Sequence, residues 1–201
     1  SRLAEHTGLP TFVDNDAKAL ALGEGWRGAA RGTASFLAMV VSTGVGGGIV
    51  LEGRLLDGDS GNAGHIGHVI VEPDGRACAC GAQGCLEAEA SGTAIAAVSG
   101  RPALEAPLEV RARTGRLVGR AVASAASLLD LRLAVVAGSV ALGFGADFFG
   151  AAHTELDRSA RLDFSRGARI LPAGLGASGP LIGAAAVAFV GLGHPVLEGR
   201  R

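Results

Sequence analysis

The sequence lacks tyrosine, has a single tryptophan, and contains only three cysteines among its 201 residues. The cysteines lie within the eight positions from Cys78 to Cys85, which does not suit a disulfide framework and is more typical of a reduced, cytoplasmic setting. The longest apolar run, Leu181 to Leu192, is too short to span a bilayer and predicts a buried helix. The N-terminus has no basic region followed by an apolar core, so no signal peptide is visible.

An excess of positive charge is also lacking, because 18 Lys and Arg residues stand against 19 Asp and Glu residues, for a formal net charge of −1. Nucleic-acid affinity depends on clustered basic side chains that meet phosphates. Four arginines gather loosely but at helical spacing, which favours a solvated helix face: Arg111, Arg113, Arg116 and Arg120. The charge balance therefore argues against a polyanion-binding surface.

The order of the apolar segments predicts one α/β domain whose sheet contains an antiparallel hairpin. Strands are expected at residues 11–13, 35–41, 49–51, 69–71, 132–137 and 169–171. Helices are expected at residues 1–7, 17–26, 117–129 and 181–190, with one more through Phe149 and Leu156. The chain starts at Ser1, in what reads as the end of a helix, so we expect further sequence upstream.

A cluster of soft ligands is the most specific feature. Cys78, Cys80 and Cys85 lie on one tight stretch with two glycines, and His68 lies ten residues before the first of them. Three thiolates and one imidazole make a closed, tetrahedral zinc site of the structural type, with no position left for water. The alternative is three buried thiols that act as small hydrophobes. The crowding of the ligands favours zinc.

Two further segments permit two interpretations each. The stretch Thr43-Gly-Val-Gly-Gly-Gly48 lies between two expected strands, where its backbone N–H groups could cradle a phosphate or simply form a turn. Asn15-Asp16 heads a helix, where the pair could be an N-cap. It could instead bind a sugar, with the Asp16 carboxylate taking a proton from the attacking hydroxyl.

Taken together, these segments resemble the ROK family of bacterial sugar kinases and sugar-responsive repressors. The acceptor-site segment would be Val13-Asp-Asn-Asp-Ala17 with Gly23-Glu24, and the second phosphate loop Ser42 to Ile49. The zinc and sugar module would be Gly64-His-Ile-Gly-His68 with Cys78-Ala-Cys-Gly-Ala-Gln-Gly-Cys-Leu-Glu87. Val135-Val-Ala-Gly-Ser139 resembles the adenosine-side turn, and Gly179-Pro-Leu-Ile-Gly-Ala-Ala185 the closing helix.

The resemblance implies an actin-like (ribonuclease H-like) fold with a zinc-binding loop insertion, residues 1–201 being the larger lobe. It implies that Asp16 is the catalytic base and that sugar is held by Asn15, Asp16, His65, His68 and Glu87. It assigns the nucleotide to Thr43, Gly44, Gly46, Gly47, Gly138 and Ser139. ATP with Mg²⁺ would be the co-substrate, zinc the structural metal, and a homodimer the expected assembly.

The sequence departs from the family pattern in three places. His65 stands where the family usually has a sugar-binding Glu, and the adenosine turn reads Ala137-Gly-Ser139 rather than a run of glycines. The family's first phosphate loop, with the smaller lobe that carries it, is absent from these residues, so this chain alone is not expected to be a competent enzyme.

Three functions compete on these residues: a sugar kinase, the sugar-sensing part of a ROK repressor, and a zinc-stabilised interaction module. An Asp-x-Gly-x-Thr loop upstream would indicate the kinase, and a helix-turn-helix would indicate a repressor that binds nucleic acid. Asp16 and the glycine stretch favour the kinase, because a sensor needs neither catalysis nor a nucleotide. The interaction module leaves Asn15-Asp16 and Glu87 unexplained.

Overall fold

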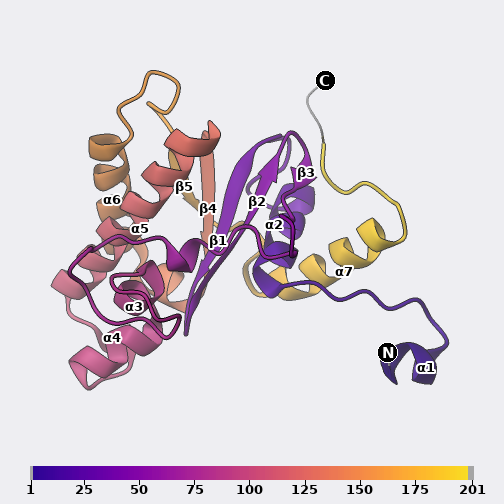
Figure 1. The fold of residues 1–201 in the computed structure, drawn as a ribbon, viewed down its shortest axis with the longest axis horizontal. Coiled ribbons are helices and arrows are strands. Elements are labelled where there is room, and N and C mark those ends of the chain that lie inside the picture. The colour runs from indigo at the N-terminus through magenta and orange to yellow at the C-terminus, as the bar shows by residue number, and fades with distance from the viewer. Residues whose placement is uncertain (1, 199–201) are drawn as a thin grey trace.

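A computed structural model describes residues 2–198. The core is a five-stranded sheet in the order β3-β2-β1-β4-β5 (Figure 1). Its strands are β1 (Phe36–Val41), β2 (Val45–Leu51), β3 (Arg54–Leu55), β4 (Leu133–Ala137) and β5 (Arg169–Pro172). The first three strands pair antiparallel in sequence order, whereas β4 pairs parallel with both β1 and β5. The expected antiparallel hairpin within an α/β sheet is therefore confirmed.

Helices cover both faces of the sheet (Figure 1). One layer contains α5 (Leu108–Leu129) and α6 (Ser139–Ser159), and the other contains α2 (Asp16–Arg27) and α7 (Gly179–Gly191). Strand β1 packs against both helix layers, because successive side chains of a strand point to opposite faces of the sheet. Leu37, Met39 and Val41 belong to the core beneath α5 and α6, whereas Phe36 and Ala38 pack with Ala21 of α2.

The helix expected at residues 117–129 exists but begins earlier, at Leu108, and α6 bends at Gly145, whose φ of 55° and ψ of −131° are not helical. The remaining elements are shorter: α1 (Arg2–Thr7), α3 (Leu86–Ala90), α4 (Gly92–Ser99), and the 3₁₀ turns η1 (Ile66–His68), η2 (Ala103–Glu105) and η3 (Gly176–Ser178). Helix α1 has no buried residue and lies apart from the layers in Figure 1.

Two expected strands are wrong. Residues 11–13 have no regular structure, because a strand needs a neighbouring ladder and Val13 instead lies 88% exposed. Residues 69–71 contribute only one isolated bridge, Ile70 with Cys85, where the chain enters the cysteine segment. β-Branched composition predicted extension in both segments, but it could not supply a partner strand.

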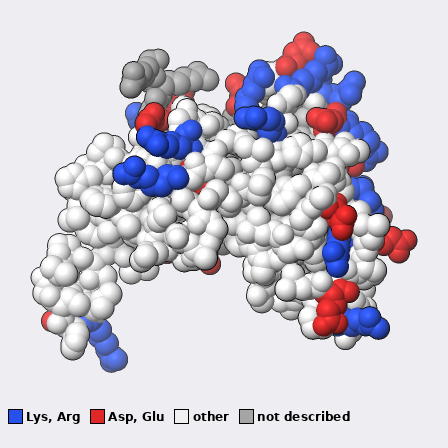
Figure 2. Space-filling model, turned by 180° about the vertical axis from the view of Figure 1, so that it is seen from behind, with Lys and Arg blue, Asp and Glu red and all other residues white. Residues whose placement is uncertain are grey.

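Within residues 2–198, no helix is long and apolar enough to cross a membrane. On the face seen in Figure 2, Lys and Arg side chains are interspersed with Asp and Glu rather than gathered into one basic patch. This mixture agrees with the balanced charge of the sequence.

Candidate functional site

Half of the glycine stretch is part of a strand rather than a loop. Gly46, Gly47 and Gly48 lie inside β2, paired with Val40, Met39 and Ala38, so the expected loop over residues 43–48 is wrong for its second half. Only Ser42 to Gly44 form the turn, which a hydrogen bond from the Ser42 N–H to the Gly44 carbonyl closes at 2.9 Å.

Steric contact explains why these strand positions are glycines. A Cβ at Gly48 would lie 2.9 Å from the Ala17 carbonyl oxygen, and one at Gly47 would lie 2.9 Å from the Gly64 carbonyl oxygen. Separations this short are not tolerated, so the missing side chains let α2 approach one face of β2 and residues 64–66 approach the other. The glycines thereby bring the head of α2 and the His65 segment to the same end of the hairpin.

Asn15 and Asp16 lie at the head of α2, and both are exposed. Asn15 is the N-cap, because its Oδ1 accepts hydrogen bonds from the N–H groups of Ala17 at 2.9 Å and Lys18 at 3.4 Å. Asp16 Oδ1 accepts from the Ala17 N–H at 2.8 Å. Capping therefore uses one oxygen of each side chain, and the Asn15 amide N–H₂ and the second Asp16 oxygen are the groups that a ligand could meet.

Four side chains meet in the cysteine segment. The ligand atoms of His68, Cys78, Cys80 and Cys85 all lie within 4.8 Å of one another. His68 Nδ1 is 3.8 Å from Cys78 Sγ, and Cys80 Sγ is 3.7 Å from Cys85 Sγ. A tetrahedron with zinc–sulfur bonds of about 2.3 Å has edges of about 3.8 Å, so this donor set fits a zinc ion.

The surroundings of two of these thiols shift their pKa values in opposite directions. Burial and the neighbouring thiols raise the pKa of Cys85 to about 12, whereas the backbone N–H of Ala82 lowers the pKa of Cys80 below its usual value. Adjacent thiolates repel one another, and a bound cation removes that penalty. The cluster is therefore chemically suited to hold a metal as thiolates.

A polar cleft of about 540 Å³ joins these parts. It is lined by Asn15 and Asp16 of α2, by the turn, by β2, and by the three side chains His65, His68 and Glu87. All five residues expected to bind sugar line this cleft, as do Thr43, Gly44, Gly46 and Gly47. His65 and His68 lie with their rings nearly parallel, 6.1 Å apart.

A second cavity, of about 600 Å³ and mainly apolar, adjoins the polar cleft, because Asp16 and Val40 line both. Its walls are the ends of β4 and β5 and the facing sides of α2 and α7, including Gly138, Ala173, Gly179 and Gly183. Gly138 has a φ of 101°, and a Cβ there would lie 2.3 Å from the Val41 carbonyl oxygen. Ser139 is not among the residues that line the two cavities; it contacts the turn, with its Oγ 2.9 Å from Ser42 Oγ.

Comparison with known proteins identifies the family of this chain. The sequence profile of the ROK family matches residues 1–189. The chain belongs to the ROK family. Its α/β architecture with a mixed sheet is the actin-like fold of ROK sugar kinases.

Among curated ROK relatives, a glucokinase of Thermotoga maritima is 53% identical over 93 residues, which cover 46% of this chain and 29% of that protein. An N-acetylmannosamine kinase of Citrobacter koseri is 38% identical over 158 residues, covering 71% of this chain and 54% of that one. The chain thus spans about 29% to 54% of the length of these relatives.

Two ROK structures resemble the fold closely. A ROK hexokinase from Thermus thermophilus has a TM-score of 0.80 and 36% identity, over 95% of this chain and 69% of its own. A ROK family transcriptional regulator, described as a homologue of the E. coli MLC protein, also has a TM-score of 0.80, at 26% identity, over 92% of this chain and 53% of its own.

Three buried charged residues support the site in this ROK chain, and of these only Glu24 belongs to a segment that the family resemblance indicated. Lys18 is 4% exposed; it forms an ion pair with Asp57 and donates to the Gly61 carbonyl at 3.2 Å, holding the segment that leads to His65. Glu24 is fully buried and accepts from the N–H groups of Ala29, Gly174 and Leu175 beside the apolar cavity. Glu89 lies beneath the cysteine segment. Neither Lys18 nor Glu89 was predicted. The local signal for Lys18 is Asp14, which lies four residues earlier, just before α2, and forms an ion pair with it at 3.6 Å.

Proposed function

We propose that this chain is the larger lobe of an ATP-dependent ROK sugar kinase that phosphorylates a hexose or an N-acetylated amino sugar. The observation that supports this best is the single polar cleft shared by Asn15, Asp16, His65, His68 and Glu87, with the glycine turn at its edge. A glucokinase and an N-acetylmannosamine kinase are among the relatives, which favours the same class of substrate here.

In the proposed reaction, a sugar hydroxyl attacks the γ-phosphorus of ATP. A new oxygen–phosphorus bond forms, the bond to the β–γ bridging oxygen breaks, and ADP leaves. The hydroxyl proton passes to Asp16, whose Oδ1 already accepts the Ala17 N–H, so its second oxygen is the base. Mg²⁺ carried by ATP neutralises charge on the phosphates.

The nucleotide is proposed to lie across the two cavities. The turn at Thr43 and Gly44 would face its phosphates, beside Gly46 and Gly47, and the apolar cavity with Gly138 would take the nucleoside. Ser139 would act through its contact with Ser42. Apolar surface beside a few polar groups is typical of cofactor sites.

Zinc is proposed to be structural, held by His68, Cys78, Cys80 and Cys85. Because His68 directs Nδ1 toward Cys78, its Nε2–H would remain to donate to a sugar hydroxyl. The metal would fix one sugar ligand and shape the loop that precedes Glu87. A cytoplasmic homodimer remains a prediction.

The test uses the full-length protein and its Asp16→Asn variant. The variant is expected to lose sugar-dependent ADP release while calorimetry finds its affinity for the same sugar largely intact, because an amide cannot accept the proton. Asp59→Asn, an exposed acid that lines neither cavity, is the control and should keep wild-type turnover. Wild-type turnover by Asp16→Asn would exclude Asp16 as the base.

The second candidate is the sugar-sensing domain of a ROK repressor, which the similarity to the ROK transcriptional regulator favours. The sequence upstream distinguishes the two. A strand followed by an Asp-x-Gly-x-Thr loop would support the kinase, and a winged helix-turn-helix would support the repressor. A repressor would bind sugar without releasing ADP.

A further inference from the structure

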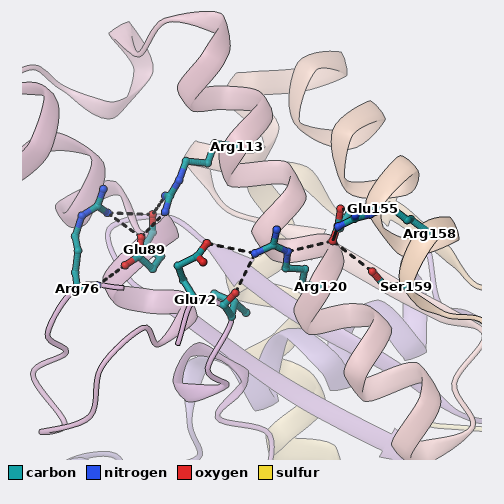
Figure 3. A network of polar contacts seen from close by, with 9 residues as sticks. Glu72, Arg76, Glu89, Arg113, Arg120, Glu155, Arg158 and Ser159 are labelled. Carbon is teal, nitrogen blue, oxygen red and sulfur yellow. Dashed lines mark hydrogen bonds and ion pairs between the residues drawn. The ribbon is translucent and has the colours of Figure 1, made fainter. Parts of the chain in front are cut away.

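Glu89 is a buried acid bound by two arginines, Arg76 and Arg113 (Figure 3). It belongs to α3, two residues after Glu87, and its side chain is 1% exposed. Its Oε1 accepts from the backbone N–H of Arg76 at 2.5 Å, and its Oε2 accepts from Arg113 Nη2 at 2.6 Å. The guanidinium of Arg76 adds an ion pair at 3.4 Å.

These contacts close the segment of residues 76–85, which we term the metal loop. Arg76 lies two residues before Cys78, and α3 begins directly after Cys85, so Glu89 joins the two ends of the loop. The Gly84 N–H donates to the Arg76 carbonyl at 2.8 Å, and Arg76 Nη1 donates to the Ala88 carbonyl at 3.3 Å. The loop is therefore closed by protein contacts independent of any metal.

The closed loop is also held against the body of the domain. Arg113 and Arg120 are seven residues apart on α5, about two helical turns, and so project from one side of the helix. Arg113 donates to Glu89, while Arg120 donates to the Val71 carbonyl at 3.1 Å and to Glu72 at 3.3 Å. Arg113 thus holds the helix that follows the metal loop, and Arg120 holds the segment that enters it (Figure 3).

Burying a carboxylate removes it from water, and this desolvation offsets much of the free energy gained from its ion pairs. A well-packed apolar side chain would stabilise the fold as well. The charged contacts add geometric specificity, because each hydrogen bond fixes one atom of α3 or of the loop relative to one partner. We propose that Glu89 is a positioning residue, which holds Glu87 in the polar cleft and Cys78 and Cys85 at ligand distance. The part concerning Glu87 rests on the proposed sugar site; the part concerning the metal loop does not.

The test compares Glu89→Gln with Glu155→Gln in the full-length protein. Glu155 is a matched control, because it is 4% exposed and its carboxylate accepts hydrogen bonds from Arg120, Arg158 and Ser159, which lie outside the metal loop and α3. Both variants keep the side-chain size and lose the charge, so both should lower the unfolding temperature.

Only Glu89→Gln should speed zinc transfer to a chelator, by about tenfold or more, the scale found for residues that orient metal ligands. It alone should increase hydrogen exchange in residues 76–87 and raise the sugar KM. Arg113→Gln, which removes a half-exposed partner of the same carboxylate, should give the same pattern more weakly if Glu89→Gln does not fold.

Equal zinc transfer and equal exchange in the Glu89 and Glu155 variants would overturn the proposal, because Glu89 would then serve stability alone. Failure of the wild-type protein to phosphorylate any sugar would instead count against the proposed function. The zinc and exchange measurements would still decide the role of Glu89.

Discussion

The Glu87 carboxylate accepts a hydrogen bond from the backbone N–H of Val45 at 2.9 Å, which ties the helix after the metal loop to the glycine turn. The N-terminus of α4 adds a second tie, since the Gly92 N–H donates to the Ser42 carbonyl at 2.7 Å. The Thr93 hydroxyl donates to the Thr43 carbonyl at 2.9 Å. The proposed sugar ligand and the proposed phosphate turn therefore form one connected unit.

Two substitutions at Glu87 should separate its two contacts. Glu87→Gln keeps an acceptor for the Val45 N–H but loses the anionic oxygen for the sugar, so it should raise mainly the sugar KM. Glu87→Ala removes both and should raise the sugar and nucleotide KM values. Each lost charged hydrogen bond is worth about 1.5–3 kcal/mol, or roughly 10-fold to 150-fold in steady-state kinetics. An unchanged sugar KM in Glu87→Gln would show that Glu87 only braces the turn.

Freshly purified protein should contain about one zinc per molecule by elemental analysis. Cys80→Ser should lose that zinc and unfold at a lower temperature by at least about 2–4 °C, the shift expected for 1 kcal/mol in a domain of this size. Ala79→Ser, on the neighbouring exposed position of the same loop, adds a hydroxyl without removing a ligand and should keep the metal. Wild-type protein that contains no zinc would refute the site.

His65 lines the polar cleft beside His68. His65→Glu adds an anionic acceptor and should change the affinity for at least one hexose by about 1 kcal/mol or more. Calorimetry across glucose, mannose and their N-acetylamino forms would measure it, with His6→Glu on the distant α1 as the control. Identical affinities for every sugar would make His65 a bystander.

The decrease in the free energy of unfolding at acid pH should depend on Glu155. Burial opposes its charge, but hydrogen bonds and ion pairs with Arg158 and Arg120 outweigh burial and hold the pKa of Glu155 below its ordinary value of 4.5. Its contribution is therefore complete above that pH and is lost as pH falls through the lowered folded-state pKa.

Glu155→Gln should accordingly cost about 1–3 kcal/mol at neutral pH and reduce the fall in unfolding free energy on acidification below pH 4.5. Denaturant unfolding between pH 3 and 7 would measure the slope. Asp163→Asn, whose side chain is 95% exposed, should leave the curve unchanged. Parallel curves for wild type and Glu155→Gln would contradict this account.

The sequence alone determined the ligand chemistry and the order of the main elements. Thiolate and imidazole are intrinsic metal ligands, so His68, Cys78, Cys80 and Cys85 indicated a site before any fold was known, and the four side chains do converge. The long helix α5 was foreseen from its apolar period, and β4 from its buried run, since local periodicity depends only on neighbours in the chain.

Tertiary structure decided everything that depended on a distant partner. Residues 11–13 and 69–71 looked like strands but have no ladder to join. The glycines of β2 looked like a loop, yet they are required by α2 on one face and by residues 64–66 on the other. The burial of Glu89 and Lys18 was not predicted, because their charged partners are distant in sequence: Arg113 lies 24 residues from Glu89, and Asp57 lies 39 residues from Lys18. A charge can be buried only where its counterion meets it, and only the folded chain brings such residues together.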